Sequence, residues 1–153
     1  MGNEAIIKRF KDFNYSLEKN IFSDMKFDIV LRKDISRSVG FYCLIKEVEF
    51  LDGTIAEVWK NNYNFLLKKN TGAFRNNAFV VCLISEKSTP SAIEVLSTYY
   101  HHKFGQAMGR IYIARKDTDE IVADIPMVLL KPAFPQFVEV ETIFSDLLYM
   151  KEI

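Results

Sequence analysis

The chain has 153 residues, of which 49% are hydrophobic and 14% aromatic, so we expect one globular domain over residues 1–153 with an aromatic-rich core. Its 20 lysine and arginine residues balance 20 aspartate and glutamate residues, and no net positive field attracts nucleic acid. Nucleic acid is therefore not an expected partner.

The first predicted element is an amphipathic helix over residues 4–21. Apolar residues recur at helical spacing from Ile6 to Ile21, and Asn3 before them is a good N-cap. Two strands follow this helix. Alternation at residues 27–31 predicts the first strand, and a run over residues 40–50 that begins apolar and then alternates predicts the second.

The dipeptide Asp52-Gly53 leaves two alternatives open. It suits a type I′ turn that would lead to a third strand. Thr54 and Glu57 instead form a capping-box pattern ahead of apolar residues at helical spacing, and a positive charge at residues 68–69 suits a helix C-terminus. We predict a helix from about residue 55 to about residue 70.

The continuous apolar run from Phe79 to Ile84 predicts a central strand that is covered on both faces. A helix is expected next, because Ser88 or Thr89 can cap it and Pro90 suits its first turn. Residues 109–113 and 121–125 predict a hairpin, and residues 140–148 a last helix. The fold class is thus α/β (α+β), a mixed five-stranded sheet covered by helices in the order α-β-β-α-β-α-β-β-α.

The two cysteines each lie inside an apolar run that predicts a buried strand. Cys43 and Cys82 are therefore expected to be core thiols, as in a reduced, cytoplasmic protein. The charged segment at residues 8–12 is unlike the apolar core of a signal peptide. No apolar stretch reaches the ~20 residues of a membrane span, so we expect no direct membrane insertion.

Four carboxylates are the first candidates for chemistry. They lie on or near the first two predicted strands, with Lys46 beside them, and are Asp28, Asp34, Glu47 and Glu49. Carboxylates can gather Mg²⁺ for phosphodiester hydrolysis, so the alternative function is a divergent Mg²⁺-dependent nuclease-like enzyme with this metal set. Adjacent strand residues point to opposite faces, so Lys46 and Glu47 do not suit one site. We expect no metal and no cofactor.

A second candidate lies at the end of the helix that begins at Pro90. Its aromatic and histidine side chains span too wide an arc to face one core stripe, and they are Tyr99, Tyr100, His101, His102 and Phe104. Exposed aromatic rings of this kind are enriched at protein interfaces. We expect this patch to bind a protein partner or to form a homodimer. The structural alternative is that the tyrosine rings are buried and the histidines favour the helix end.

Three segments follow one another in an order that resembles a known family. They are the run Phe79–Ser85, the helix started by a proline and the hairpin GRIYIARKDTDEIVADIP. They resemble the soluble cytosolic domain that precedes the membrane part of some bacterial rhomboid intramembrane proteases. The resemblance covers most of the chain and implies a domain accessory to a membrane protein. It carries over no functional residue, because that family's catalytic serine and histidine lie in its membrane part. We therefore expect a non-enzymatic interaction or regulatory domain.

Overall fold

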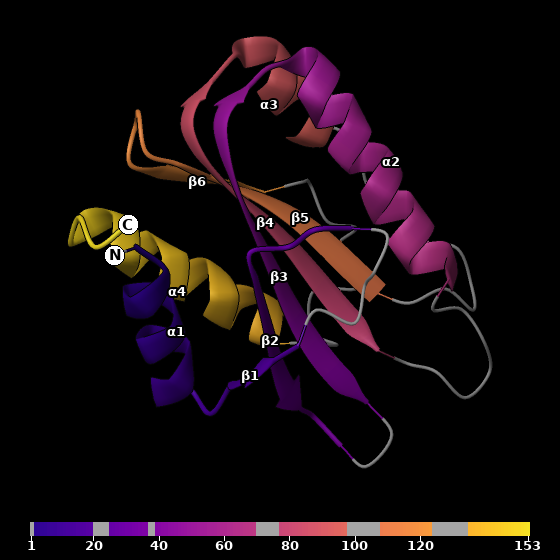
Figure 1. Ribbon diagram of the computed structural model, residues 1–153, viewed down its shortest axis with the longest axis vertical. Coiled ribbons are helices and arrows are strands. Elements are labelled where there is room, and N and C mark those ends of the chain that lie inside the picture. Colours follow the sequence, from indigo (N-terminus) through magenta and orange to yellow (C-terminus); the bar gives the residue numbers. More distant parts are fainter. Residues whose placement is uncertain (1, 20–24, 37–38, 70–76, 98–107, 124–134) are drawn as a thin grey trace.

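A six-stranded mixed sheet lies in the middle of the molecule and has helices on both faces (Figure 1). The computed structural model describes residues 2–19, 25–36, 39–69, 77–97, 108–123 and 135–153. The described helices are α1 (Gly2–Asp12), α2 (Gly53–Lys69), α3 (Pro90–Ser97) and α4 (Gln136–Tyr149). The strands are β1 (Ser16–Glu18), β2 (Ile29–Asp34), β3 (Gly40–Leu51), β4 (Ala78–Ser88), β5 (Met108–Arg115) and β6 (Glu120–Ala123).

The strands lie in the sheet in the same order as in the sequence. The first three pair antiparallel, β4 and β5 pair parallel to β3, and β6 returns antiparallel to β5. Helix α2 connects the parallel strands β3 and β4, and α3 follows β4. The predicted α+β class and mixed sheet are confirmed, with six strands in place of five.

The additional strand is β1, which lies where we predicted the first helix to continue. That helix was predicted over residues 4–21 but begins at Gly2 and ends at Asp12. Asn14 adopts φ 68°, and the N–H groups of Asn14 and Tyr15 donate to the carbonyls of Lys11 and Phe10. This is a Schellman ending, in which asparagine tolerates the left-handed conformation. The Tyr15 ring closes it by packing edge-on against Phe10, with centroids 5.0 Å apart.

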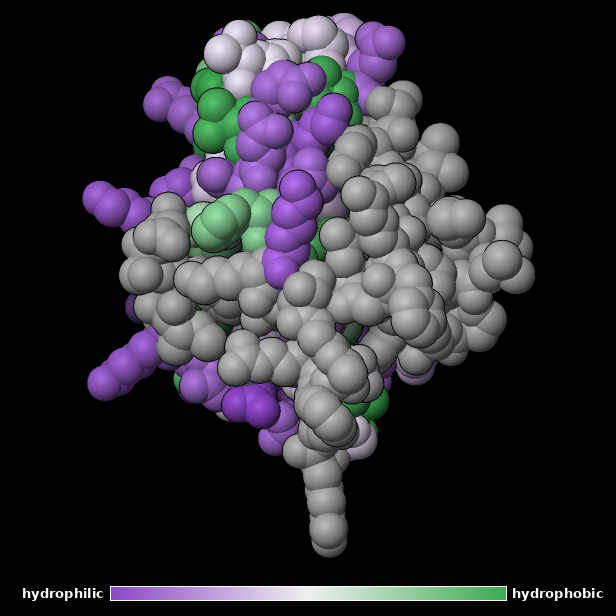
Figure 2. Space-filling view, turned by 90° about the vertical axis from the view of Figure 1, so that its right-hand side faces the viewer, coloured by the Kyte–Doolittle hydropathy of each residue, from purple (hydrophilic) through white to green (hydrophobic). Residues whose placement is uncertain are grey.

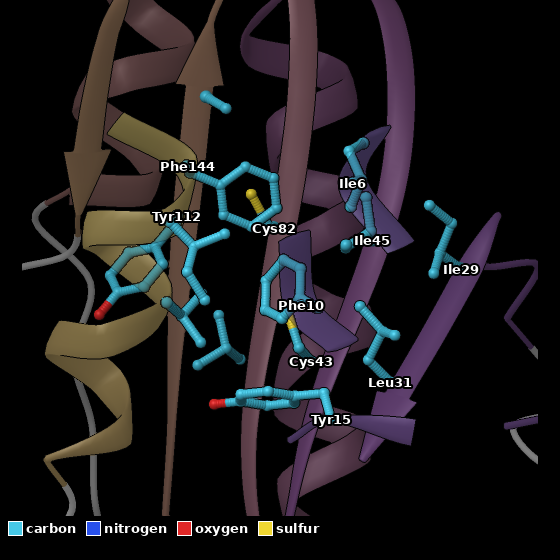
Figure 3. Close-up of a cluster of buried hydrophobic side chains, with 14 of the residues drawn as sticks. Ile6, Phe10, Tyr15, Ile29, Leu31, Cys43, Ile45, Cys82, Tyr112 and Phe144 are labelled. Atoms are coloured by element: carbon cyan, nitrogen blue, oxygen red, sulfur yellow. The ribbon is translucent and has the colours of Figure 1, made fainter. Parts of the chain in front are cut away.

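Each face of the sheet has its own core. Over residues 41–45 of β3, odd positions such as Cys43 and Ile45 pack with α1 and α4, while even positions such as Leu44 pack with α2 and α3. Strand β4 is buried from Ala78 to Ser85, which confirms the predicted central strand. Figure 3 shows Cys43 and Cys82 among the aromatic rings of the α1 and α4 side.

Both cysteines are free and buried, as predicted. Burial raises the pKa of both thiols well above the ordinary value, because a thiolate would lose its hydration. These thiols are therefore core side chains and are not poised as nucleophiles.

Helix α2 was predicted correctly, but its cap was not. The N–H of Ile55 donates to Asp52 Oδ1 at 2.9 Å, and the N–H of Ala56 donates to the Asp52 carbonyl. Asp52 is thus the N-cap, two residues earlier than the predicted Thr54 box. The predicted cap of α3 is confirmed at Thr89, whose Oγ1 accepts from the Ala92 N–H. No helix among the described residues is long and apolar enough to cross a membrane.

Candidate partner-binding groove

An open groove of about 800 Å³ lies at the carboxyl ends of β3 and β4. We call it the β3–β4 groove, and its lining residues are Glu47, Val48, Glu49, Phe50, Ile84, Glu86, Lys87 and Lys116. In open sheets with parallel strands, ligands bind at the carboxyl ends of those strands. The position of the groove therefore makes it the first candidate for a binding site.

The groove exists because β3 and β4 are longer than the strands beside them. Strand β2 begins at Ile29, opposite Ile45, and β5 ends at Arg115, opposite Ser85. The ends of β3 and β4 continue past these points, away from α1 and α4 and toward α3 (Figure 1). The burial of β3 changes at the same place, from buried through Ile45 to mostly exposed over residues 46–50.

The groove presents two neighbouring carboxylates with no ion-pair partner among the described residues. Glu47 and Glu49 are two positions apart on β3 and are both exposed, so they point to the same side of the sheet. The third carboxylate, Glu86 on β4, pairs with Lys116 at 2.6 Å. Lys87 on β4 also lines the groove and has no ion pair within the described ranges, so the groove presents two acidic groups on β3 and one basic group on β4. In the sequence of β3, Val48 and Phe50 alternate with the two glutamates, and Phe50 is 48% exposed.

The outer edge of β4 is closed where β5 ends. The Lys116 N–H donates to the Ser85 carbonyl, and Arg115 Nε donates to Ser88 Oγ at 2.8 Å. Asp117 Oδ2 accepts from the Ser88 N–H at 3.5 Å and pairs with Arg115. The turn after β5 therefore continues the pairing of β4 with side chains.

On the outer edge of β3, Asp28 continues the hydrogen bonding of β2 as far as the Glu47 N–H. The Asp28 N–H donates to the Ile45 carbonyl at 2.9 Å, and the Glu47 N–H donates to Asp28 Oδ2 at 2.7 Å. Backbone groups alternate between the two sides of a strand, so those of residues 45 and 47 point away from β4. The alternation shifts further along, because the Leu51 carbonyl faces β4 and accepts from the Thr89 N–H.

The four carboxylates of the predicted metal set do not form one cluster. Asp28 pairs with Lys46 at 3.4 Å and caps the Glu47 N–H. Asp34 lies at the other end of β2, opposite Gly40, and pairs with Arg32. Only Glu47 and Glu49 reach the groove. Across the described parts of the chain, no group of three or more histidine, cysteine, aspartate or glutamate side chains is placed to hold a metal ion.

The predicted interaction patch lies outside the described residues. All five of its members, Tyr99, Tyr100, His101, His102 and Phe104, belong to residues 98–107. The prediction that they form a partner surface stays a prediction.

A second apolar surface lies on α2, where Val58 and Phe65 are exposed at a spacing of two helical turns. Figure 2 shows this side of the molecule, with green hydrophobic surface between purple hydrophilic residues. The backbone of a helix is satisfied internally, so this face offers side chains alone. The groove combines carboxylates with an exposed aromatic ring in one hollow, which gives it more binding chemistry.

No family model matches the chain, and neither the curated proteins nor the solved structures include a match. The groove was missed by sequence reasoning, although β3 carried a signal for it. A strand that is buried for six residues and then alternates Glu47 and Glu49 with Val48 and Phe50 leaves the core partway along its length.

Proposed function

We propose that this protein is a non-enzymatic interaction domain that binds a partner protein in the β3–β4 groove. The observation that carries the proposal is the exposed end of β3, which combines two unpaired carboxylates with a half-exposed phenylalanine. Aromatic side chains are enriched at the centre of protein interfaces. Unpaired surface charges select a partner by complementarity.

Balanced net charge supports local recognition. The chain carries as many basic as acidic residues, so no long-range field steers a partner, and discrimination falls to the charges inside the groove. The resemblance in layout to the domain that precedes rhomboid proteases motivates a regulatory role in the cytoplasm next to a membrane protein. In that reading the groove binds a segment of the membrane protein exposed to the cytoplasm.

Photo-crosslinking tests this function. Benzoylphenylalanine in place of Phe50 should give a discrete adduct with one partner protein in the cells that produce the chain. The matched control carries the same group in place of Val138, which is 51% exposed on α4, away from the groove. The adduct at position 50 should disappear with Glu47→Lys and Glu49→Lys together. Identical adducts at both positions, or none at position 50, would contradict the proposal.

The metal-dependent alternative is tested separately. Only two of its four carboxylates, Glu47 and Glu49, lie in the groove, and a Mg²⁺ site needs several oxygen ligands. Titration with Mn²⁺ should leave the amide signals of these two residues without saturable broadening. Saturable broadening there, together with Mn²⁺-dependent cleavage of nucleic acid that is lost in Glu47→Gln, would replace the interaction proposal with the nuclease.

A further inference from the structure

The β3–β4 groove places acidic side chains beside an aromatic ring. Glu47 and Glu49 have no ion-pair partner among the described residues, and Phe50 follows Glu49 directly in the chain. All three residues line the groove, and Phe50 is half-exposed. A bound group that is both cationic and flat can therefore contact a carboxylate and the ring together.

A guanidinium group suits this combination better than an ammonium group. Arginine presents N–H donors in a planar fork that matches a carboxylate, and the flat guanidinium stacks on aromatic rings. Lysine carries a compact and strongly hydrated charge. Arg32 of this chain makes both contacts at once, since it pairs with Asp34 at 2.9 Å and its guanidinium carbon lies 5.5 Å from the centre of the Tyr42 ring.

The charges that line the groove limit how many cations it can hold. They are three carboxylates (Glu47, Glu49 and Glu86) and two ammonium groups (Lys87 and Lys116), which gives a net charge of −1. One bound arginine neutralises this charge. Because Lys87 is the register partner of Phe50 and paired strands lie about 4.8 Å apart, a second cation bound near the ring is repelled.

We propose that the β3–β4 groove recognises a single arginine of the partner protein, flanked by uncharged residues. This inference rests on the proposed interaction function and specifies the chemistry of the partner. The guanidinium donates to Glu47 or Glu49 and stacks on Phe50, and Lys87 discriminates against runs of basic residues. An exposed ion pair is weak by itself, so the carboxylate and the ring act together on one group.

The probe is a pentapeptide with one central arginine between two leucines, glycine at both ends and blocked termini. It is titrated into the full chain, and binding is followed by the amide chemical shifts of residues 47–50. We expect saturable shifts there. Citrulline in place of the arginine keeps the shape without the charge and should bind roughly fivefold more weakly. Lysine in that place should also bind more weakly than arginine.

Matched variants assign the two contacts of the arginine. Glu47→Gln with Glu49→Gln should lose the preference for arginine over citrulline. Glu57→Gln with Glu152→Gln removes the same charge at exposed sites outside the groove, and should bind as the wild type does. Phe50→Leu keeps an apolar side chain without a ring, so the arginine and lysine peptides should then bind with similar affinity. The urea-unfolding curve of each variant checks its folding.

A pentapeptide with three arginines, in place of the central residue and both glycines, tests the discrimination by Lys87. Lys87→Gln removes one positive charge from the groove. It should therefore strengthen binding of the three-arginine peptide by a larger factor than binding of the single-arginine peptide, at the same ionic strength. An equal effect on both peptides would show that Lys87 does not set the number of basic residues.

The outcomes separate the recognition of arginine from the proposed function. Absence of saturable shifts at residues 47–50, equal affinity for the citrulline peptide, or an arginine preference that survives Glu47→Gln with Glu49→Gln would each overturn it. A preference for arginine over lysine that persists in Phe50→Leu would overturn the stacking. If the crosslink from position 50 persists in these cases, the groove binds its partner through other chemistry. If the crosslink is absent as well, the proposed function fails too.

Discussion

The two cysteines predict a specific dependence of stability on pH. Burial raises the pKa of Cys43 and Cys82, so the folded protein keeps protons that the unfolded chain releases above about pH 8.5. The folded state then binds more protons than the unfolded state, and the free energy of unfolding falls as the pH rises. Each thiol contributes up to about 1.4 kcal/mol per pH unit in this range.

Urea unfolding of wild type and Cys43→Ala, compared from neutral pH to pH values above the ordinary thiol pKa, measures this contribution. The variant should show a shallower fall than the wild type by the contribution of one thiol. The absolute stabilities also differ because of the small cavity, so the comparison uses slopes only. Equal slopes in the two proteins would show that the Cys43 thiol ionises as readily when folded as when unfolded.

Gly109 is a residue whose role the sequence could not reveal. We predicted only that it opens a strand, and β5 does begin beside it at Met108. In the structure, a Cβ at Gly109 would lie 2.8 Å from Leu67 Cδ2 and 2.9 Å from Tyr63 Oη. Helix α2 therefore packs so closely against β5 that a Cβ at this position would force the Leu67 and Tyr63 side chains to shift. Contacts between residues this far apart in sequence leave no local pattern.

At the scale of elements, the cap of α2 gives a direct prediction. Asp52→Ala removes the acceptor of the Ile55 N–H and should lower the free energy of unfolding by about 1 kcal/mol, within the 0.5–2 kcal/mol typical of N-caps. Thr54→Ala, on the first turn of the same helix, should change it much less. Urea unfolding of the two variants checks this, and a larger loss in Thr54→Ala would support the capping box in place of Asp52.

Periodicity predicted most elements correctly and failed where a local ending interrupted it. Strands β3 and β4 and helices α2 and α4 follow from continuous patterns. The helical spacing of apolar residues continues beyond Asp12 through Leu17, so the pattern alone extends α1. The helix ends earlier because Asn14 turns the chain and Tyr15 packs on Phe10. Leu17, placed on β1, is then 49% exposed.

The candidate site was predicted less well than the fold, because its position depends on the register of the strands. The alternative metal set required Asp28, Asp34, Glu47 and Glu49 to converge. Antiparallel pairing of β2 with β3 instead places Asp34 opposite Gly40, at the far end of β2 from Asp28. In the same register, β2 begins opposite Ile45, so the part of β3 after Ile45 is not paired with β2. Register is set by the packing of whole strands, which a single sequence does not display.

At the scale of the whole molecule, the two ends of β3 and β4 differ in how the helices cover them. Helices α1 and α4 cover one face over the lengths of β3 and β4 that are paired on both sides, and α2 and α3 cover the other. Past Ile45, β3 leaves the face covered by α1 and α4, while Val48 and Leu51 still pack with α2 and α3. The groove lies where this coverage ends, and the account depends on a partner that binds there.

Photo-crosslinking from position 50 tests the binding role of this groove most directly. With benzoylphenylalanine in place of Phe50, the account predicts a discrete adduct with one partner protein that disappears when Glu47 and Glu49 are both changed to lysine. An adduct that forms equally from position 138 on α4, or that survives this charge reversal, would contradict the account.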